Sequence, residues 1–63
     1  MISKNIRNLR IRKGISQDRL SKLADLSLNT IVKVESGRSP NPTIGTLLKI
    51  ARSLDAQIND LIK

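Results

Sequence analysis

The sequence contains no cysteine, no histidine and no aromatic residue. Without cysteine or histidine it has no disulfide, no thiol chemistry and none of the usual ligand sets for structural zinc. Paired carboxylates at a spacing useful for acid–base chemistry are also missing. We therefore expect no enzymatic activity, no metal and no cofactor. Without Phe, Tyr or Trp, the core must be aliphatic, and the chain has no stacking platform for the splayed bases of RNA or single-stranded DNA.

Long apolar runs are missing as well. No stretch approaches the ~20 residues that a membrane-spanning helix needs, and there is no apolar segment typical of a secretory signal. A basic amphipathic membrane peptide fits poorly, because Gly and Pro divide the apolar residues among short segments. We interpret residues 1–63 as one small domain without room for an enzymatic cleft beside its core. Because the chain ends just after its last apolar pair, a further domain or protein partner stays open as an alternative.

Acidic residues are few. Five Asp and Glu stand against twelve Lys and Arg, which gives a formal charge of +7. Residues 1–38 contain nine of the basic and three of the acidic side chains, a net charge of +6, and the remainder has +1. A basic half beside a near-neutral half indicates one surface that faces a polyanion and one that packs or faces a partner. Six basic residues are assigned to a solvated surface that steers association, without an individual contact: Lys4, Arg7, Arg12, Lys13, Arg19 and Lys22.

Apolar periodicity and capping residues predict five helices and no strand. Their approximate ranges are 4–13, 16–24, 28–36, 44–54 and, for a short closing helix, 58–62. Potential N-caps stand at Ser3, Ser16, Ser27 and Thr43. Gly14 and Gly37 follow the first and third helices as left-handed stops. One apolar stripe of each helix should face the core. These stripes contain Ile6, Leu9, Leu20, Leu23, Ala24, Ile31, Val34, Ile44, Leu47, Leu48, Ala51, Leu54, Ile58, Leu61 and Ile62.

The segment from Ser16 to Gly37 is the most informative part of the chain. It predicts two short helices joined by a tight turn at Asp25. In the second of these helices Ile31 and Val34 face inward, which leaves an outer arc of the helix without a role in the core. A serine-capped helix with such an arc is what a DNA major groove accepts. The segment therefore predicts a helix-turn-helix.

Four residues of that outer arc are predicted base contacts: Leu28, Asn29, Val32 and Lys33. The amide of Asn29 can pair with adenine, and the ammonium group of Lys33 can donate to guanine. Leu28 or Val32 can touch a thymine methyl group. Two alternatives stay open: an ordinary solvated helix face and, for Val32, packing against its own domain or a second subunit.

Seven residues are predicted phosphate contacts: Ser16, Gln17, Ser36, Arg38, Ser39, Asn41 and Thr43. Ser16 and Gln17 open the second helix, where free backbone N–H groups and the helix dipole favour an anion. The others flank the end of the third helix and the start of the fourth. Gln17 is alternatively a plain first-turn residue, and Thr43 is foremost a helix cap.

Arg10 and Glu35 lie on helix faces that otherwise carry core residues. We therefore predict that they pair with one another and fasten the first helix to the third. A carboxylate left uncompensated close to phosphates would be unfavourable.

The order and spacing of these residues resemble those of the phage-repressor and Cro-type (lambda-repressor-like, XRE) helix-turn-helix family. Besides Arg10 and Leu20, the matching segments are Gly14–Gln17, Leu26–Ser27, Thr30–Ile31, Val34–Gly37, Asn41–Thr43 and Thr46–Leu54. The resemblance covers nearly the whole chain and implies an all-α, compact five-helix domain with the helix-turn-helix at its second and third helices. It also implies a transcriptional repressor or regulator that binds double-stranded DNA as a two-fold homodimer. The location that it implies is the cytoplasm of a bacterium or a phage-infected cell, in association with the nucleoid.

The sequence departs from the family pattern at three positions. Asp25 and Asp55 stand where Gly commonly ends the second and fourth helices, and Ser21 replaces a common Ala between the two motif helices. Asp tolerates the left-handed region better than most residues, so both turns remain possible at some cost. Ser21 is small enough to keep the close approach.

The function and the dimer surface each leave room for interpretation. A protein-interaction module, in which the same fold serves an antitoxin or contacts RNA polymerase, stays open as an alternative function. For the homodimer, the end of the fourth helix and residues 56–62 are the predicted surface, because they are apolar and near-neutral.

Overall fold

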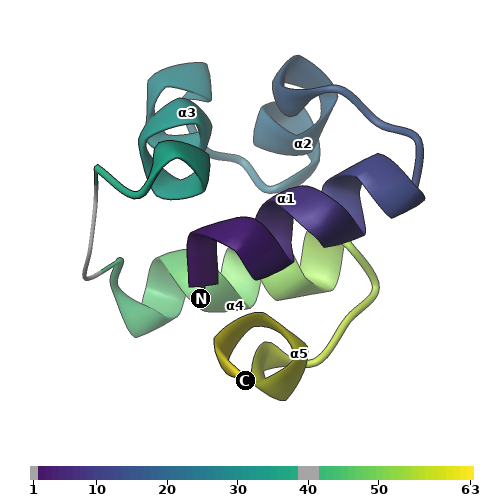
Figure 1. Cartoon of the computed structure of the whole chain (residues 1–63). Coiled ribbons are helices and arrows are strands. Elements are labelled where there is room, and N and C mark those ends of the chain that lie inside the picture. Colours follow the sequence, from purple (N-terminus) through teal and green to yellow (C-terminus); the bar gives the residue numbers. More distant parts are fainter. Residues whose placement is uncertain (1, 39–41) are drawn as a thin grey trace.

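The computed structural model describes residues 2–38 and 42–63 and contains helices only in these ranges (Figure 1). The five helices are α1 (Ile2–Arg12), α2 (Gln17–Leu23), α3 (Leu28–Ser36), α4 (Ile44–Ser53) and α5 (Ile58–Ile62). α1 packs against α3 and α5, α2 packs against α3 and α4, and α4 packs against α5. The predicted all-α class and the order of its five helices are confirmed.

Three helices begin at a side-chain cap that the sequence predicts. Ser16 Oγ accepts a hydrogen bond from Arg19 N at 3.0 Å, and Ser27 Oγ accepts one from Thr30 N at 3.1 Å. Thr43 Oγ1 accepts one from Thr46 N at 3.1 Å. Each bond satisfies an N–H group that has no partner within the helix.

The predicted cap at Ser3 is wrong. α1 already begins at Ile2, so Ser3 lies within its first turn. The side chain of Ile2 is partly buried and packs against the core. Its burial favours a helix that starts before the serine, and a capping signal alone does not report that tertiary contact.

α1, α2, α3 and α4 all end in the same left-handed turn. The residues at positive φ are Gly14 (71°), Asp25 (55°), Gly37 (81°) and Asp55 (53°). After α2, the N–H of Leu26 donates to Ser21 O at 2.9 Å, and after α4 the N–H of Ala56 donates to Ala51 O at 2.8 Å. These bonds are the six-to-one contacts of a Schellman motif, which satisfies the last carbonyls of a helix. Both aspartates therefore adopt the conformation for which glycine is the usual choice.

The core is aliphatic and draws on every helix. Its largest fully buried side chains are Ile6, Leu20, Ile31, Ile50, Leu54 and Leu61. α1, α2, α3 and α5 contribute one of these each, and α4 with its C-cap contributes two. Burial of such a side chain contributes about 1.5–3 kcal/mol relative to its exposed state.

Four predicted core residues are exposed instead: Leu23, Ile44, Leu48 and Ile62. Ile44 keeps 64% and Leu48 keeps 40% of its surface in contact with solvent. α4 buries a narrower stripe, formed by Leu47, Ile50 and Ala51, than the spacing of its apolar residues suggests. Helical periodicity predicts the apolar arc, but the neighbouring helices decide how much of that arc they cover.

One contact that sequence reasoning missed joins the two ends of the fold. The Nδ2 group of Asn5 in α1 donates to Leu61 O at 3.0 Å and to Lys63 O at 2.9 Å. These carbonyls belong to the last turn of α5 and to its C-cap residue. Asn5 therefore ties α5 to α1. No helix of the described residues is long and apolar enough to cross a membrane.

Candidate nucleic-acid interface

α2, the turn at Asp25 and α3 form a helix-turn-helix. The two helices pack against one another (Figure 1), and the small side chain of Ser21 is buried in α2. Its hydroxyl group donates to Asp18 O at 2.6 Å, so its burial leaves no polar atom without a partner. Ser21 thus permits the close approach that the sequence analysis expects of it.

α3 has one buried face and one exposed face. Ile31, Val34 and Glu35 are buried against the rest of the domain. The opposite face exposes the four predicted base contacts, Leu28, Asn29, Val32 and Lys33. Val32 is the less exposed of the two apolar residues, at 36% against 44% for Leu28.

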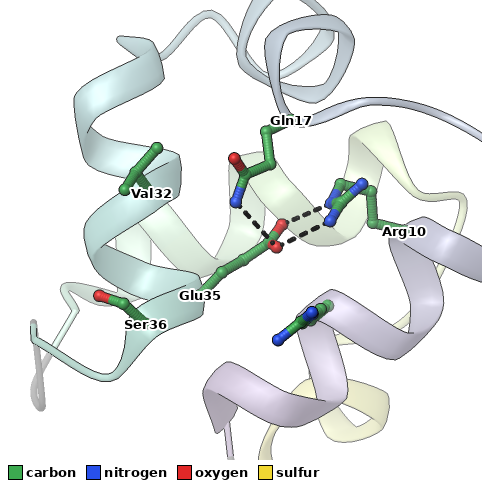
Figure 2. A pocket seen from close by; sticks show the side chains of 6 residues that line it. Arg10, Gln17, Val32, Glu35 and Ser36 are labelled. Carbon is green, nitrogen blue, oxygen red and sulfur yellow. Dashed lines mark hydrogen bonds and ion pairs between the residues drawn. The ribbon is translucent and has the colours of Figure 1, made fainter.

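Arg10 and Glu35 lie together beneath this exposed face (Figure 2). Arg10 Nε donates to Glu35 Oε2 at 2.7 Å, and Arg10 Nη2 donates to Glu35 Oε1 at 3.1 Å. The side chains are 13% and 3% exposed, respectively, so the pair is largely shielded from solvent. Such a two-pronged contact joins α1 to α3 in a single orientation.

Arg10 also reaches the start of α2. Its Nη1 group donates to Ile15 O at 2.8 Å, in the connection that leads into the Ser16 cap. One guanidinium group therefore holds α1, the entry to α2 and the back of α3. The planar fork of arginine makes these three directions possible at once, whereas a lysine ammonium group has no such fixed geometry.

Gln17 belongs to the same network, although the sequence predicts no contact between Gln17 and Glu35. Its Nε2 group donates to Glu35 Oε1 at 3.2 Å, as Figure 2 shows. Eighteen positions separate the two residues, so no local pattern announces the contact. The bond uses one of the two N–H donors of the amide and leaves the other available to a ligand.

The other predicted phosphate contacts differ in how their hydroxyl groups are engaged. Ser16 Oγ accepts from Arg19 N, which leaves its proton free to be donated. Thr43 Oγ1 accepts from Thr46 N and donates to Thr46 Oγ1 at 3.0 Å, so its hydroxyl is used up in the cap. Ser36 Oγ donates to Lys33 O at 3.0 Å and would have to rotate before donating to a phosphate.

Three more predicted phosphate contacts follow α3 in the sequence: Arg38, Ser39 and Asn41. Arg38 is exposed just beyond the left-handed turn at Gly37. Ser39 and Asn41 lie outside the described residues. Within 2–38 and 42–63, no three Asp or Glu residues gather in a group that could hold a metal ion.

The sequence and the fold can be compared with those of known proteins. A profile of the Cro/C1-type helix-turn-helix DNA-binding domain matches residues 5–63. An uncharacterised HTH-type transcriptional regulator of Archaeoglobus fulgidus is 39% identical over 56 residues, which cover 89% of this chain and 79% of that protein.

A solved structure shares the fold. The restriction-modification controller protein C.AhdI from Aeromonas hydrophila superposes with a TM-score of 0.91 at 33% sequence identity. The match covers 95% of this chain and 89% of that chain.

The chain belongs to the Cro/C1-type helix-turn-helix DNA-binding domain family. The predicted family is thereby confirmed. Membership assigns the chain to the DNA-binding regulators of transcription.

Proposed function

We propose that the chain is a sequence-specific regulator, acting as a repressor, that places α3 in the major groove of double-stranded DNA. The exposed face of α3 carries the proposal. Leu28, Asn29, Val32 and Lys33 are exposed there, although the other face of the same helix is buried. With its side chains an α-helix is about 10–12 Å across, which matches a major groove of about 12 Å.

The chemistry of this face suits base edges. The amide of Asn29 presents one acceptor and two donors, which pair with N6 and N7 of adenine. The ammonium group of Lys33 donates to O6 or N7 of guanine. Leu28, at the first turn of α3, offers an apolar surface to a thymine methyl group.

A homodimer would place two such faces on one duplex. α4 and α5 pack together and expose Ile44, Leu48 and Ile62. The residues after position 38 have a net charge of only +1, so two copies of this surface would repel one another little. On α4 the exposed large apolar residues, Ile44 and Leu48, lie in the first half of the helix, whereas the surface predicted from the sequence lies at its end.

Selection from a pool of random-sequence duplexes tests the proposal. At about physiological salt, a specific dimer should enrich a palindrome whose half-sites lie about one helical turn apart, ~34–36 Å in dimeric repressors of this fold. Enrichment of a single half-site would still support sequence-specific DNA binding but would contradict the homodimer.

Two other outcomes would contradict sequence-specific binding. Retention of duplexes without an enriched motif would mean that counterion release alone drives the affinity. Absence of duplex affinity, together with salt-insensitive binding to a protein, would favour the protein-interaction module instead.

A further inference from the structure

A hollow of about 360 Å³ lies between α1, the start of α2 and α3. Its walls are formed by Arg7, Arg10, Gln17, Val32, Glu35 and Ser36. Figure 2 shows the Arg10–Glu35 pair and the Gln17 amide on one side and Val32 and Ser36 on α3 on the other. From the sequence alone, Arg7 is predicted only to belong to a general basic surface.

Two cationic side chains line this hollow, Arg7 and Arg10, but only one carboxylate does, that of Glu35. The carboxylate of Glu35 accepts three hydrogen bonds, two from Arg10 and one from Gln17. The carboxylate of Glu35 therefore balances the positive charge of Arg10. Arg7 stands three positions earlier on α1, on the same side of the helix, and its side chain is exposed. Among the described residues, no hydrogen bond or ion pair connects Arg7 to another side chain.

The hollow borders the surface that reads DNA. Val32 and Ser36 line the hollow and are also exposed on α3. A helix that fills the major groove has the phosphates of the two strands on either side of it. The edge of α3 that carries Val32 and Ser36 therefore brings the hollow, and Arg7 with it, against one wall of the groove.

We propose that this hollow binds a phosphate group of the DNA backbone, with Arg7 as its principal ligand. The guanidinium group offers a planar pair of N–H donors that matches two phosphate oxygens. The second N–H of the Gln17 amide, whose first N–H is held by Glu35, supplies a third donor. The first helix thereby contacts DNA directly. This inference rests on the proposed function.

The salt dependence of binding to the selected duplex tests the contribution of Arg7. Arg7→Gln should lower the slope of log affinity against log salt by about 0.9 for each bound subunit, the value for one phosphate contact. Between about 50 and 200 mM salt, the affinity ratio of wild type to variant should then shrink about threefold for each bound subunit, and so about twelvefold for the proposed dimer. Arg7→Lys, which keeps the charge without the fork, should retain most of the slope.

Arg12→Gln is the matched control. Arg12 lies on the same helix and is also exposed, but it lines a different hollow with Asp60 and Lys63. Its substitution removes the same charge and should leave the slope nearly unchanged. Equal slope changes for both variants would mean a general field effect and would overturn the proposal. Circular dichroism of each variant checks that the helices remain.

Neutral phosphates in the duplex locate the contact. Replacing one phosphate at a time with a methylphosphonate should reveal a position whose neutralisation weakens wild-type binding but not binding of the Arg7→Gln variant. Equal losses for both proteins at every position would overturn the role of Arg7 while leaving DNA binding intact. Inorganic phosphate, added at the concentration of the competing salt, should not abolish the difference in binding between wild type and the Arg7→Gln variant. The reason is that the proposed ligand is a phosphate held in place by the duplex. Failure of the wild type to bind any duplex would overturn the proposed function as well.

Discussion

At the scale of single residues, the Arg10–Glu35 pair links folding to the orientation of the α3 face that we propose binds DNA. The pair is shielded from solvent, and each of its charged groups has one further hydrogen-bond partner. Arg10 also donates to Ile15 O, and Glu35 also accepts from Gln17 Nε2. A buried pair contributes little net free energy compared with apolar residues, but removal of one partner leaves an uncompensated charge in a poorly solvated place. The pair therefore serves orientation more than overall stability.

Either Arg10→Leu or Glu35→Leu should destabilise the domain severely. We expect the free energy of unfolding to fall by about 3–5 kcal/mol, because each variant strands the partner's charge. Urea unfolding followed by circular dichroism measures this loss. Asp18→Asn is the control, since Asp18 forms an exposed pair with Lys22 at 3.2 Å with 60% of its side chain in solvent. The control should change stability by less than about 1 kcal/mol. Unchanged urea midpoints for the Arg10 and Glu35 variants would contradict the prediction.

Asn29→Ala should relax specificity at one base pair of each half-site. Loss of a two-pronged contact to adenine removes about 1–3 kcal/mol of discrimination at that position, while other positions keep theirs. Competition between the selected duplex and its single-base variants measures the effect. Asn8→Ala, an exposed asparagine on α1, should preserve the wild-type preference at every position. A uniform loss of affinity without loss of discrimination would mean that Asn29 contacts the backbone instead.

At the scale of helices, most boundaries could be predicted from sequence, because their causes are local. The side-chain caps at Ser16, Ser27 and Thr43 depend on atoms three residues away. The start of α1 could not be predicted in the same way, since Ile2 gains its stability from distant core residues. The exposure of Ile44 and Leu48 escaped prediction for the same reason.

The left-handed turns allow a test of helix endings. Asp25→Gly should stabilise the domain by about 0.5–1 kcal/mol, because glycine relieves the strain of a positive φ at 55°. Gly14→Ala should have the opposite sign and a comparable size, since an added Cβ would meet no atom within 4 Å and only the backbone strain at φ 71° would count. Thermal unfolding measures both variants. A lower melting temperature for Asp25→Gly would show that the Asp25 side chain contributes more than its strain costs.

At the scale of the whole molecule, charge and apolar exposure are separated along the chain. The first 38 residues have a net charge of +6, and the helix-turn-helix lies within them. The later helices α4 and α5 carry little net charge and expose Ile44, Leu48 and Ile62. This separation is what the proposed homodimer on DNA requires: a basic surface towards the duplex and an apolar surface towards a second copy.

Leu48→Glu should prevent the proposed homodimer. A carboxylate in the middle of an apolar contact must lose its hydration without a partner, and the two-fold axis brings two such charges together. Sedimentation equilibrium should show monomers, and affinity for the palindrome should fall towards that for a single half-site. Leu23→Glu on α2, where the wild-type leucine is also exposed, is the control and should leave the dimer intact. A dimer that persists in the Leu48 variant would contradict this surface.

Much of the candidate site could also be predicted from sequence. The exposed arc of α3 follows from helical spacing once Ile31 and Val34 are assigned to the core. The partnership of Arg10 and Glu35 follows from two charges on otherwise apolar faces. The Gln17 contact with Glu35 and the hollow beside Arg7 could not be predicted, because they depend on the distance between helices that are far apart in sequence.

The sequence by itself determined the order of the five helices, the side-chain caps of α2, α3 and α4, an aliphatic core and a basic first half, because each depends on neighbouring residues or on composition alone. The tertiary structure decided which apolar residues remain exposed, which donors surround Glu35 and that Arg7 lines a hollow beside α3. The physical reason is that burial and hydrogen bonding between helices depend on how the helices cross. That arrangement emerges only when all five share one core.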